Sequence, residues 1–160
     1  PMSRGLGDVY KRQIINSIQN ISIKGRLEEI KSGKLKTIAG NNRLIVDGGH
    51  NISASLSIAN WIKNQNQEVN LIVGMMKDKE HIEFIKSFRN IVNSITLIDI
   101  PNQDGAISKE DLESKLNDLN LNIKRSQSIE SAIKLLSKNK NTITLCIGSL
   151  YLAGEILKLN

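Results

Sequence analysis

Cysteine is nearly absent from the sequence, because Cys146 is the only one among 160 residues. A single cysteine cannot form a disulfide within the chain, which is typical of a protein from a reducing compartment. It lies inside the apolar run of residues 142–147. A thiol in such a run behaves as a small buried hydrophobic group, so we expect a core residue and not a nucleophile.

Long hydrophobic runs are also absent. No stretch of about 18 apolar residues could cross a bilayer, and the chain does not open with a signal-peptide pattern. We therefore expect a soluble, cytoplasmic protein with no membrane partner. With 39% hydrophobic residues in 160, the chain is long enough to bury one core, which predicts one folded domain.

Aromatic side chains make up only 3% of the residues, although the net charge is +6. The 22 basic residues are spread along the chain and form no block of five or six. A surface that stacks nucleic-acid bases needs aromatic rings and a clustered basic stripe. We therefore expect no nucleic-acid partner, and we take the charge as weak support for a small anionic ligand. We expect the protein to be a monomer.

The sequence lacks the motifs of several nucleotide and metal sites. It has no phosphate loop, because Ser32-Gly33-Lys34 is followed by Leu35 and lacks the upstream glycine. It also has no Gly-x-Gly-x-x-Gly after a strand-like segment. His50 and His81 stand apart with a single cysteine, which does not give the ligand spacing of a zinc site, so we expect no metal ligands. We expect His81 to lie on the surface of an amphipathic helix.

The most informative feature that is present follows the apolar run Leu44–Val46. This strand-like run ends in Asp47, two glycines, His50 and Asn51, and a helix-like segment begins at residue 52. A helix N-terminus at the carboxyl end of a strand offers free N–H groups to phosphate or carboxylate, and Asn51 is a good N-cap. The alternative is that these residues form only a turn.

Apolar periodicity predicts that strands alternate with helices along the chain. The expected strands are residues 69–74, 94–98, 121–124 and 142–147; the expected helices are residues 52–66, 80–88, 108–119, 128–138 and 149–159. Leu56 and Leu135 are expected on the inward faces of their helices, and residues 34–46 are expected to form a β-hairpin around Gly40-Asn41-Asn42. The pattern predicts a three-layer, Rossmann-like α/β fold with a mostly parallel sheet and helices on both faces.

Three loops are expected to meet at the carboxyl edge of this sheet, at residues 47–51, 74–79 and 148–151. Asp47 could accept hydrogen bonds from sugar hydroxyls, and His50 could donate to a phosphate. Lys79 could hold a carboxylate or phosphate, and Ser149 begins a helix whose N-terminus points to the same edge. The alternatives are that Ser149 only caps its helix and that Lys79 is only a solvated lysine. Together the loops favour an anion site.

Residues 1–13 differ from the rest of the chain in their hydrophobic pattern, since they show neither helical nor strand periodicity. We interpret them as a non-native or disordered leader, with a genuine flexible arm as the alternative. The domain is expected to span residues 14–160.

Four motifs, in this order and spacing, resemble the C-terminal domain of folylpolyglutamate synthase and bifunctional dihydrofolate synthase, within the Mur ligase family. They are Gly25-Arg26-Leu27-Glu28, the Asp-Gly-Gly-His-Asn of residues 47–51, the Gly-Met-Met-Lys-Asp-Lys of residues 74–79, and the Gly-Ser-Leu-Tyr-Leu-Ala-Gly-Glu of residues 148–155. The resemblance covers about residues 14–160 and implies the Mur ligase C-terminal fold.

The resemblance implies ATP-dependent addition of L-glutamate to folate or dihydropteroate through an acyl phosphate. It implies that Arg26, Asp47, His50 and Asn51 contribute to the ATP site, with His50 beside the reacting groups. It also implies that Lys79 and Ser149 hold L-glutamate. In this family the phosphate loop and most of the Mg²⁺ and folate sites lie on an N-terminal domain, which this sequence lacks. The resemblance therefore implies that the chain alone is inactive.

The sequence departs from the family pattern at two motifs. Ile23-Lys24 stand where the family has Trp-Pro, and Gly49 and Ile52 stand where it has Ala and Pro. The second departure leaves the polar groups of the motif unchanged. A stand-alone nucleotide- or amino-acid-binding module without catalysis remains the main alternative to a ligase domain, and a basic RNA-associated domain is a weaker one.

Overall fold

The structure is a computed structural model that describes residues 26–160. The expected leader at residues 1–13, and residues 14–25 of the expected domain, lie outside the described residues. The strands are β1 (Glu28–Ile30), β2 (Arg43–Val46), β3 (Val69–Val73), β4 (Ser94–Leu97), β5 (Ile123–Arg125) and β6 (Ile143–Ile147). The helices are α2 (Lys34–Ala39), α3 (Ile52–Lys63), α4 (His81–Lys86), α5 (Lys109–Lys115), α6 (Ile129–Leu136) and α7 (Leu150–Leu159), with a 3₁₀ turn η1 (Asn117–Leu119).

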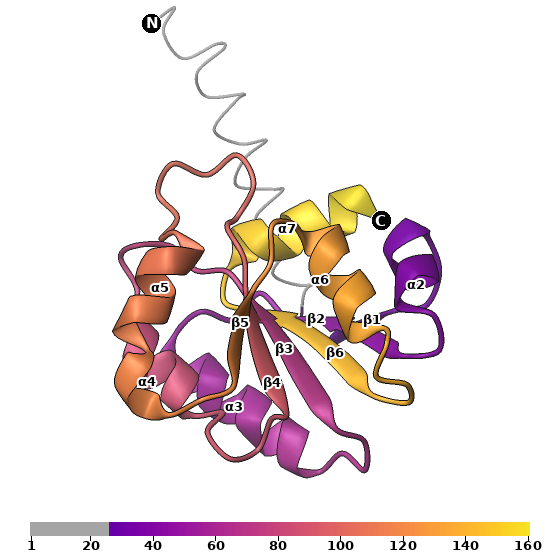
Figure 1. Ribbon diagram of the computed structural model, residues 1–160, viewed down its shortest axis with the longest axis horizontal. Coiled ribbons are helices and arrows are strands. Elements are labelled where there is room, and N and C mark those ends of the chain that lie inside the picture. The colour runs from indigo at the N-terminus through magenta and orange to yellow at the C-terminus, as the bar shows by residue number, and fades with distance from the viewer. Residues whose placement is uncertain (1–25) are drawn as a thin grey trace, which may run out of the picture.

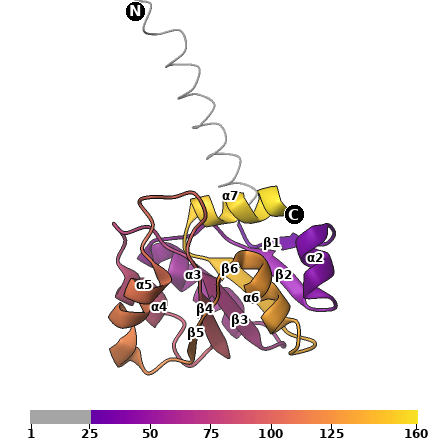
Figure 2. The ribbon, with the colours of Figure 1, turned by 45° about the horizontal axis from the view of Figure 1, so that its top comes forward.

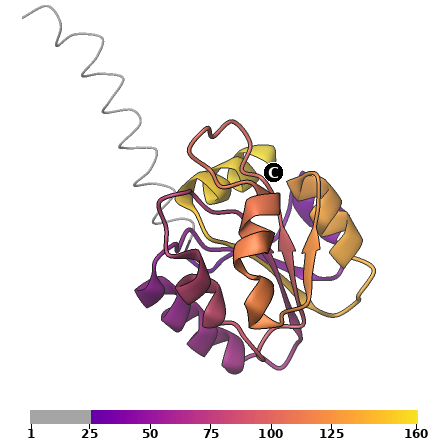
Figure 3. The same ribbon diagram turned by 60° about the vertical axis from the view of Figure 1, so that its left-hand side comes forward.

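The strands form one six-stranded sheet in the order β1-β2-β6-β3-β4-β5. All neighbouring pairs are parallel except β1 and β2, which pair antiparallel with Ile30 opposite Leu44. Helices cover both faces of the sheet, as Figures 1 and 3 show. The expected three-layer α/β fold with a mostly parallel sheet is therefore confirmed.

Two hydrophobic clusters fill the spaces between the sheet and its helices. One cluster packs α3, α4 and α5 against side chains such as Leu71 and Leu145, and the other packs α2, α6 and α7 against Ile72 and Cys146. Figure 2 shows α2, α6 and α7 gathered on their side of the sheet. Every residue of β3 and β6 is buried, as expected for central strands covered on both faces. Cys146 is 1% exposed, which confirms it as a core residue, and this burial raises the pKa of its thiol to about 12.

The expected hairpin at residues 34–46 is wrong. Residues 34–39 form helix α2, and the antiparallel partner of β2 is β1, which the sequence analysis did not assign to any element. Leu35 and Ala39, one helical turn apart, bury the inner face of α2. The helix begins at Gly33, which has no capping side chain, and Asn160 caps it instead by accepting a hydrogen bond from the Leu35 N–H at 3.0 Å.

Three side-chain placements from the sequence analysis are also wrong. Leu56 is 60% exposed and Leu135 is 41% exposed, because neighbours on their own helices occupy the inward positions instead. His81 is 3% exposed and lies in the interior, not on the surface. No helix within residues 26–160 is long and apolar enough to cross a membrane.

Candidate functional site

The carboxyl end of β2 opens into a cavity of about 510 Å³. Four of the six expected site residues line it: Arg26, Asp47, His50 and Asn51. The remaining lining residues come from the same loop, the first two turns of α3 and the neighbouring chain segments: Leu27, Gly48, Gly49, Ser53, Ala54, Ser57, Ile58 and Leu150. The antiparallel pairing of β1 with β2 brings Arg26 to this cavity, although 21 positions separate it from Asp47.

Asp47 is held by main-chain donors on both of its carboxylate oxygens. The Gly49 N–H donates to Oδ1 at 2.7 Å, and the Leu27 N–H donates to Oδ2 at 3.1 Å. Burial raises the pKa of Asp47, while these two hydrogen bonds and the charge of Arg26 oppose the rise. The carboxylate therefore joins the start of β1 to the loop after β2, and each oxygen keeps lone-pair capacity for a ligand hydroxyl.

His50 is half-buried at the cavity wall, and its Nδ1 lies 3.2 Å from the carbonyl oxygen of Gly48. Since a carbonyl only accepts, Nδ1 carries the proton of this contact, and Nε2 is the nitrogen available to a ligand. Asn51 caps α3, because its Oδ1 accepts from the Ala54 N–H at 2.8 Å, which confirms the expected cap. The cavity thus includes a helix N-terminus, a place that favours anions.

The loop after β2 is packed tightly at both of its glycines, most of all at Gly49. A Cβ at Gly49 would lie 2.7 Å from Cβ of Ala54 and 2.8 Å from Oδ1 of Asp47. A Cβ at Gly48 would lie 2.5 Å from a methyl carbon of Leu150. Gly49, at the position where the family pattern has alanine, thus permits the close approach of α3 and of the Asp47 carboxylate.

The three expected loops do meet at one edge of the sheet. The Gly148 N–H donates to the Gly49 carbonyl oxygen at 3.1 Å, which joins the loops after β6 and β2. Gly148 has φ of +113°, and a Cβ there would lie 2.5 Å from the carbonyl oxygen of Gly74, so the loop after β3 lies directly against it. This packing confirms the expected convergence of the loops.

Ser149 and Lys79, the two expected glutamate-binding residues, do not line the cavity. Ser149 is 2% exposed, and its hydroxyl oxygen accepts from the Tyr151 and Leu152 N–H groups at the start of α7. Lys79 is half-buried in the turn before α4, where its carbonyl oxygen accepts from the His81 N–H at 3.1 Å. Both belong to loops that border the cavity loop.

Three cavity residues that carry polar or strained groups were not among the expected site residues. Ser53 and Ser57 lie one turn apart on α3, and their helical spacing beside the glycine loop is a signal that could have identified them. Leu27 adopts a φ of +45°, which is unusual for a branched side chain and turns its N–H toward Asp47. No sequence signal marks that conformation. Within residues 26–160 no three acidic, histidine or cysteine side chains form a metal-binding group.

The family model for the C-terminal domain of dihydrofolate synthetase matches residues 30–159 of the chain. The chain belongs to this family. A relative in Schizosaccharomyces pombe, described as a probable dihydrofolate synthetase, is 22% identical, and its match covers 89% of this chain and 36% of the relative.

Solved structures of folylpolyglutamate synthases share the fold. The Mycobacterium tuberculosis enzyme complexed with ADP and AMPPCP matches with a TM-score of 0.70 and 16% identity, over 84% of this chain and 31% of that protein. A bifunctional folylpolyglutamate synthase/dihydrofolate synthase with Mn, AMPPNP and L-glutamate bound matches with a TM-score of 0.64 and 16% identity, over 84% and 30%. The dihydrofolate synthetase-type domain described here thus spans about a third of the length of these relatives.

Proposed function

We propose that this chain is the C-terminal domain of an ATP-dependent ligase that adds L-glutamate to folate or dihydropteroate. One observation carries the proposal: in a member of the dihydrofolate synthetase family, a single cavity gathers Arg26, Asp47, His50 and Asn51 at the carboxyl edge of the sheet. A guanidinium, a carboxylate, an imidazole and a helix N-terminus together suit a nucleotide, which has both phosphates and ribose hydroxyls.

The proposed enzyme has a second domain. Residues 14–160 are the glutamate-ligase domain, and an N-terminal domain carries the phosphate loop and most of the Mg²⁺ and folate sites. The length of the relatives, of which this chain matches about a third, supports this division. The isolated chain then binds part of each substrate and does not turn over. We propose that residues 1–13 are a leader outside the domain, and that the enzyme is a cytoplasmic monomer.

ATP is proposed to lie across the cavity. Asp47 accepts hydrogen bonds from the ribose hydroxyls, and its fixed position supports this role because main-chain donors hold both oxygens. Arg26 and the N-terminus of α3 at Asn51 face the phosphates. ATP supplies the phosphoryl group that activates the folate carboxylate. The relatives' complexes with ADP, AMPPCP and AMPPNP support the choice of ligand.

His50 is proposed to stand beside the phosphates and the carboxyl group that reacts. Its Nδ1 donates to the Gly48 carbonyl oxygen, and in the imidazolium form, which carries a proton on both nitrogens, Nε2 can donate to the negative charge that builds up during transfer. A donor that is already oriented avoids the cost of reorganisation at the moment of reaction. This arrangement supports His50 as the catalytic residue of the chain.

L-Glutamate is proposed to bind between the loops that carry Lys79 and Ser149. The Lys79 ammonium pairs with a glutamate carboxylate, and the Ser149 hydroxyl can donate its proton to the substrate while its oxygen accepts from two N–H groups. Contacts of Gly148 with Gly49 and Gly74 place both loops beside the proposed ATP cavity. Bringing the amine and the activated carboxyl together is the main contribution expected of these residues.

Complementation in trans tests the proposal. The chain is mixed with a separately produced N-terminal domain of a folylpolyglutamate synthase, ATP, Mg²⁺, L-glutamate and a reduced folate or dihydropteroate, and the release of phosphate and glutamylated product is measured. We expect activity only with both pieces, and we expect its loss with the His50→Ala chain. The matched control is Leu56→Ala on the exposed face of α3, which should keep activity. Tight ATP binding by the chain alone, without product, would favour a non-catalytic binding module instead.

A further inference from the structure

A buried histidine lies outside the proposed ATP cavity and has no role in the function proposed above. His81 is the first residue of α4 and is only 3% exposed. Its Nε2 lies 2.8 Å from the carbonyl oxygen of Met76, and its Nδ1 lies 3.4 Å from Nζ of Lys115 near the end of α5. Both ring nitrogens therefore contact polar groups, each from a different segment of the chain.

The chemistry of the two contacts fixes the direction of both hydrogen bonds. The Met76 carbonyl can only accept, so the proton of this bond lies on Nε2 of His81. The Lys115 ammonium can only donate, so Nδ1 presents its lone pair. His81 is thus a donor to the loop and an acceptor from α5, which an apolar side chain of the same size could not be.

The loop that His81 holds is the one that carries Lys79. The main-chain N–H of His81 donates to the Lys79 carbonyl oxygen at 3.1 Å, while its ring bonds to Met76, so one residue ties both ends of the short turn. On the other side the Lys77 N–H donates to Gly105 at 2.8 Å, and the Ile107 N–H donates to Met75 at 3.0 Å. The backbone from Met75 to Lys79 is therefore held from both sides.

We propose that His81 is a positioning residue for the L-glutamate site: its ring fixes the turn of residues 76–79 and so the place from which Lys79 meets the amino-acid carboxylate. This inference rests on the proposed function. A lysine on a loose turn would have to lose its main-chain freedom when the substrate binds, whereas a turn already fixed by His81 has lost it before binding. The effect should therefore fall on L-glutamate and not on ATP, whose proposed ligands belong to other loops.

The test compares His81→Leu, His81→Gln and the exposed neighbour Ile82→Ala in the complementation assay. His81→Leu keeps an apolar core side chain and removes the donor, so the KM for L-glutamate should rise about tenfold, which corresponds to about 1.4 kcal/mol, while the KM for ATP stays within about twofold. His81→Gln can place an N–H near the position of Nε2 and should recover most of the loss. Ile82→Ala, at a side chain that is 43% exposed, should match the unsubstituted chain.

Two results would overturn the inference: an unchanged KM for L-glutamate in His81→Leu, or an equal change in the KM for both substrates, which would indicate general loss of structure. Amide hydrogen exchange of the chain alone gives a second readout that needs no activity. His81→Leu should accelerate exchange at Lys77 and His81, whose N–H groups donate to the carbonyl oxygens of Gly105 and Lys79. If the unsubstituted pair makes no product, the proposed function fails, and unchanged exchange would then refute the positioning role separately.

Discussion

Two aspartates at the carboxyl edge of the sheet show how differently the same side chain can be used. Asp47 directly follows β2, and Asp99 follows β4 at a distance of two residues. Asp47 is 9% exposed and its oxygens accept from main-chain N–H groups, whereas the Asp99 side chain is 50% exposed and accepts from the main chain and the ammonium of Lys109 at 2.8 and 2.7 Å. Only Asp47 lines the large cavity.

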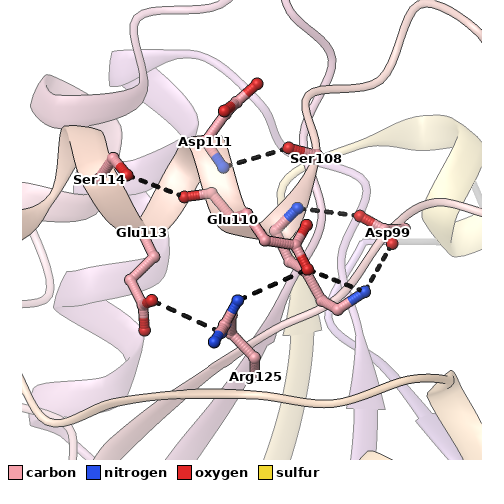
Figure 4. A network of polar contacts seen from close by, with 8 residues as sticks. Asp99, Ser108, Glu110, Asp111, Glu113, Ser114 and Arg125 are labelled. Carbon is pink, nitrogen blue, oxygen red and sulfur yellow. Dashed lines mark hydrogen bonds and ion pairs between the residues drawn. The ribbon is translucent and has the colours of Figure 1, made fainter.

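The surroundings of Asp99 explain its role. Figure 4 shows Asp99 near a network in which Arg125 approaches Glu110 and Glu113. Lys109, which pairs with Asp99, also approaches Glu110 at 3.5 Å. The bond from the Lys109 N–H places Asp99 at the start of α5, beside the Ser108 cap. A carboxylate whose partners are an exposed ion network and a helix end stabilises the local fold, while a carboxylate in a cavity remains available to a ligand.

Asp47→Ala and Asp99→Ala should separate the two roles most strongly in the complementation assay. Asp47→Ala removes the acceptor of the Leu27 and Gly49 N–H groups and the proposed acceptor of the ribose hydroxyls, so we expect activity to fall by about 100-fold. Asp99→Ala should keep activity within about threefold, because its network lies outside the cavity. Equal losses in the two variants would refute the distinction.

Gly49→Ala tests how tightly the Asp47 loop is packed. The added methyl would meet Ala54 at 2.7 Å and the Asp47 carboxylate at 2.8 Å, so the loop must shift. We expect a loss of about 2 kcal/mol in the free energy of unfolding, measured by urea denaturation. Gly40→Ala would be a poor control because Gly40 has a φ of +64°, but Gly105→Ala meets only the flexible end of Met76 and should cost less.

Asp99→Ala should have a smaller effect on stability. The substitution removes two hydrogen bonds at the start of α5. The ion pair between Asp99 and Lys109 is partly exposed, however, and water screens its charges. We expect the free energy of unfolding to fall by about 0.5–1 kcal/mol. Lys109→Met removes the ammonium and keeps the main-chain bond, so a loss as large as that of Asp99→Ala would show that the ion pair, and not the helix end, carries the effect.

Much of this edge could be predicted from sequence because its signals are local. The Asp-Gly-Gly-His-Asn loop follows an apolar run and precedes a helical period, and both Asn51 and Ser108 cap their helices as expected. The expected sheet follows from the alternation of strands and helices. These features depend on residues within a few positions of one another, which is the range over which periodicity and capping signals act.

The remaining features depend on contacts between distant parts of the chain. β1 has only three residues, too few to show a strand pattern, and it is a strand because it pairs with β2. The short helix α2 is followed by Gly40-Asn41-Asn42, which resembles a hairpin turn, and its start is capped by Asn160, 125 positions beyond Leu35. His81 is buried because Met76 and Lys115 satisfy its nitrogens, and Lys115 is 34 positions away. No local pattern encodes such partners.

The pH dependence of stability should show the smallest difference between Asp47 and Asp99, and it distinguishes them because their pKa values shift in opposite directions. Burial raises the pKa of Asp47 above its ordinary value of 3.8, so the folded state takes up a proton before the unfolded state as the pH falls, and this group stabilises the fold towards acid. Burial would also raise the pKa of Asp99, but the hydrogen bonds and charge of Lys109 outweigh it and hold that pKa below 3.8. Asp99 therefore stabilises the fold above its ordinary pKa, and the contribution is lost as the pH falls through its lower folded value.

Urea denaturation of Asp47→Asn and Asp99→Asn between about pH 3 and pH 7 measures the two contributions. Relative to the unsubstituted chain, Asp99→Asn should be most destabilised near neutral pH and should approach it in acid. Asp47→Asn should show the opposite trend, with its relative stability improving as the pH rises, because the substitution removes a buried charge that neutral pH imposes. Parallel curves for the two variants would mean that burial does not dominate at Asp47. The carboxylate in the cavity would then be as well stabilised as the one on the surface, and its raised pKa could no longer be used to distinguish the ligand-facing aspartate from the structural one.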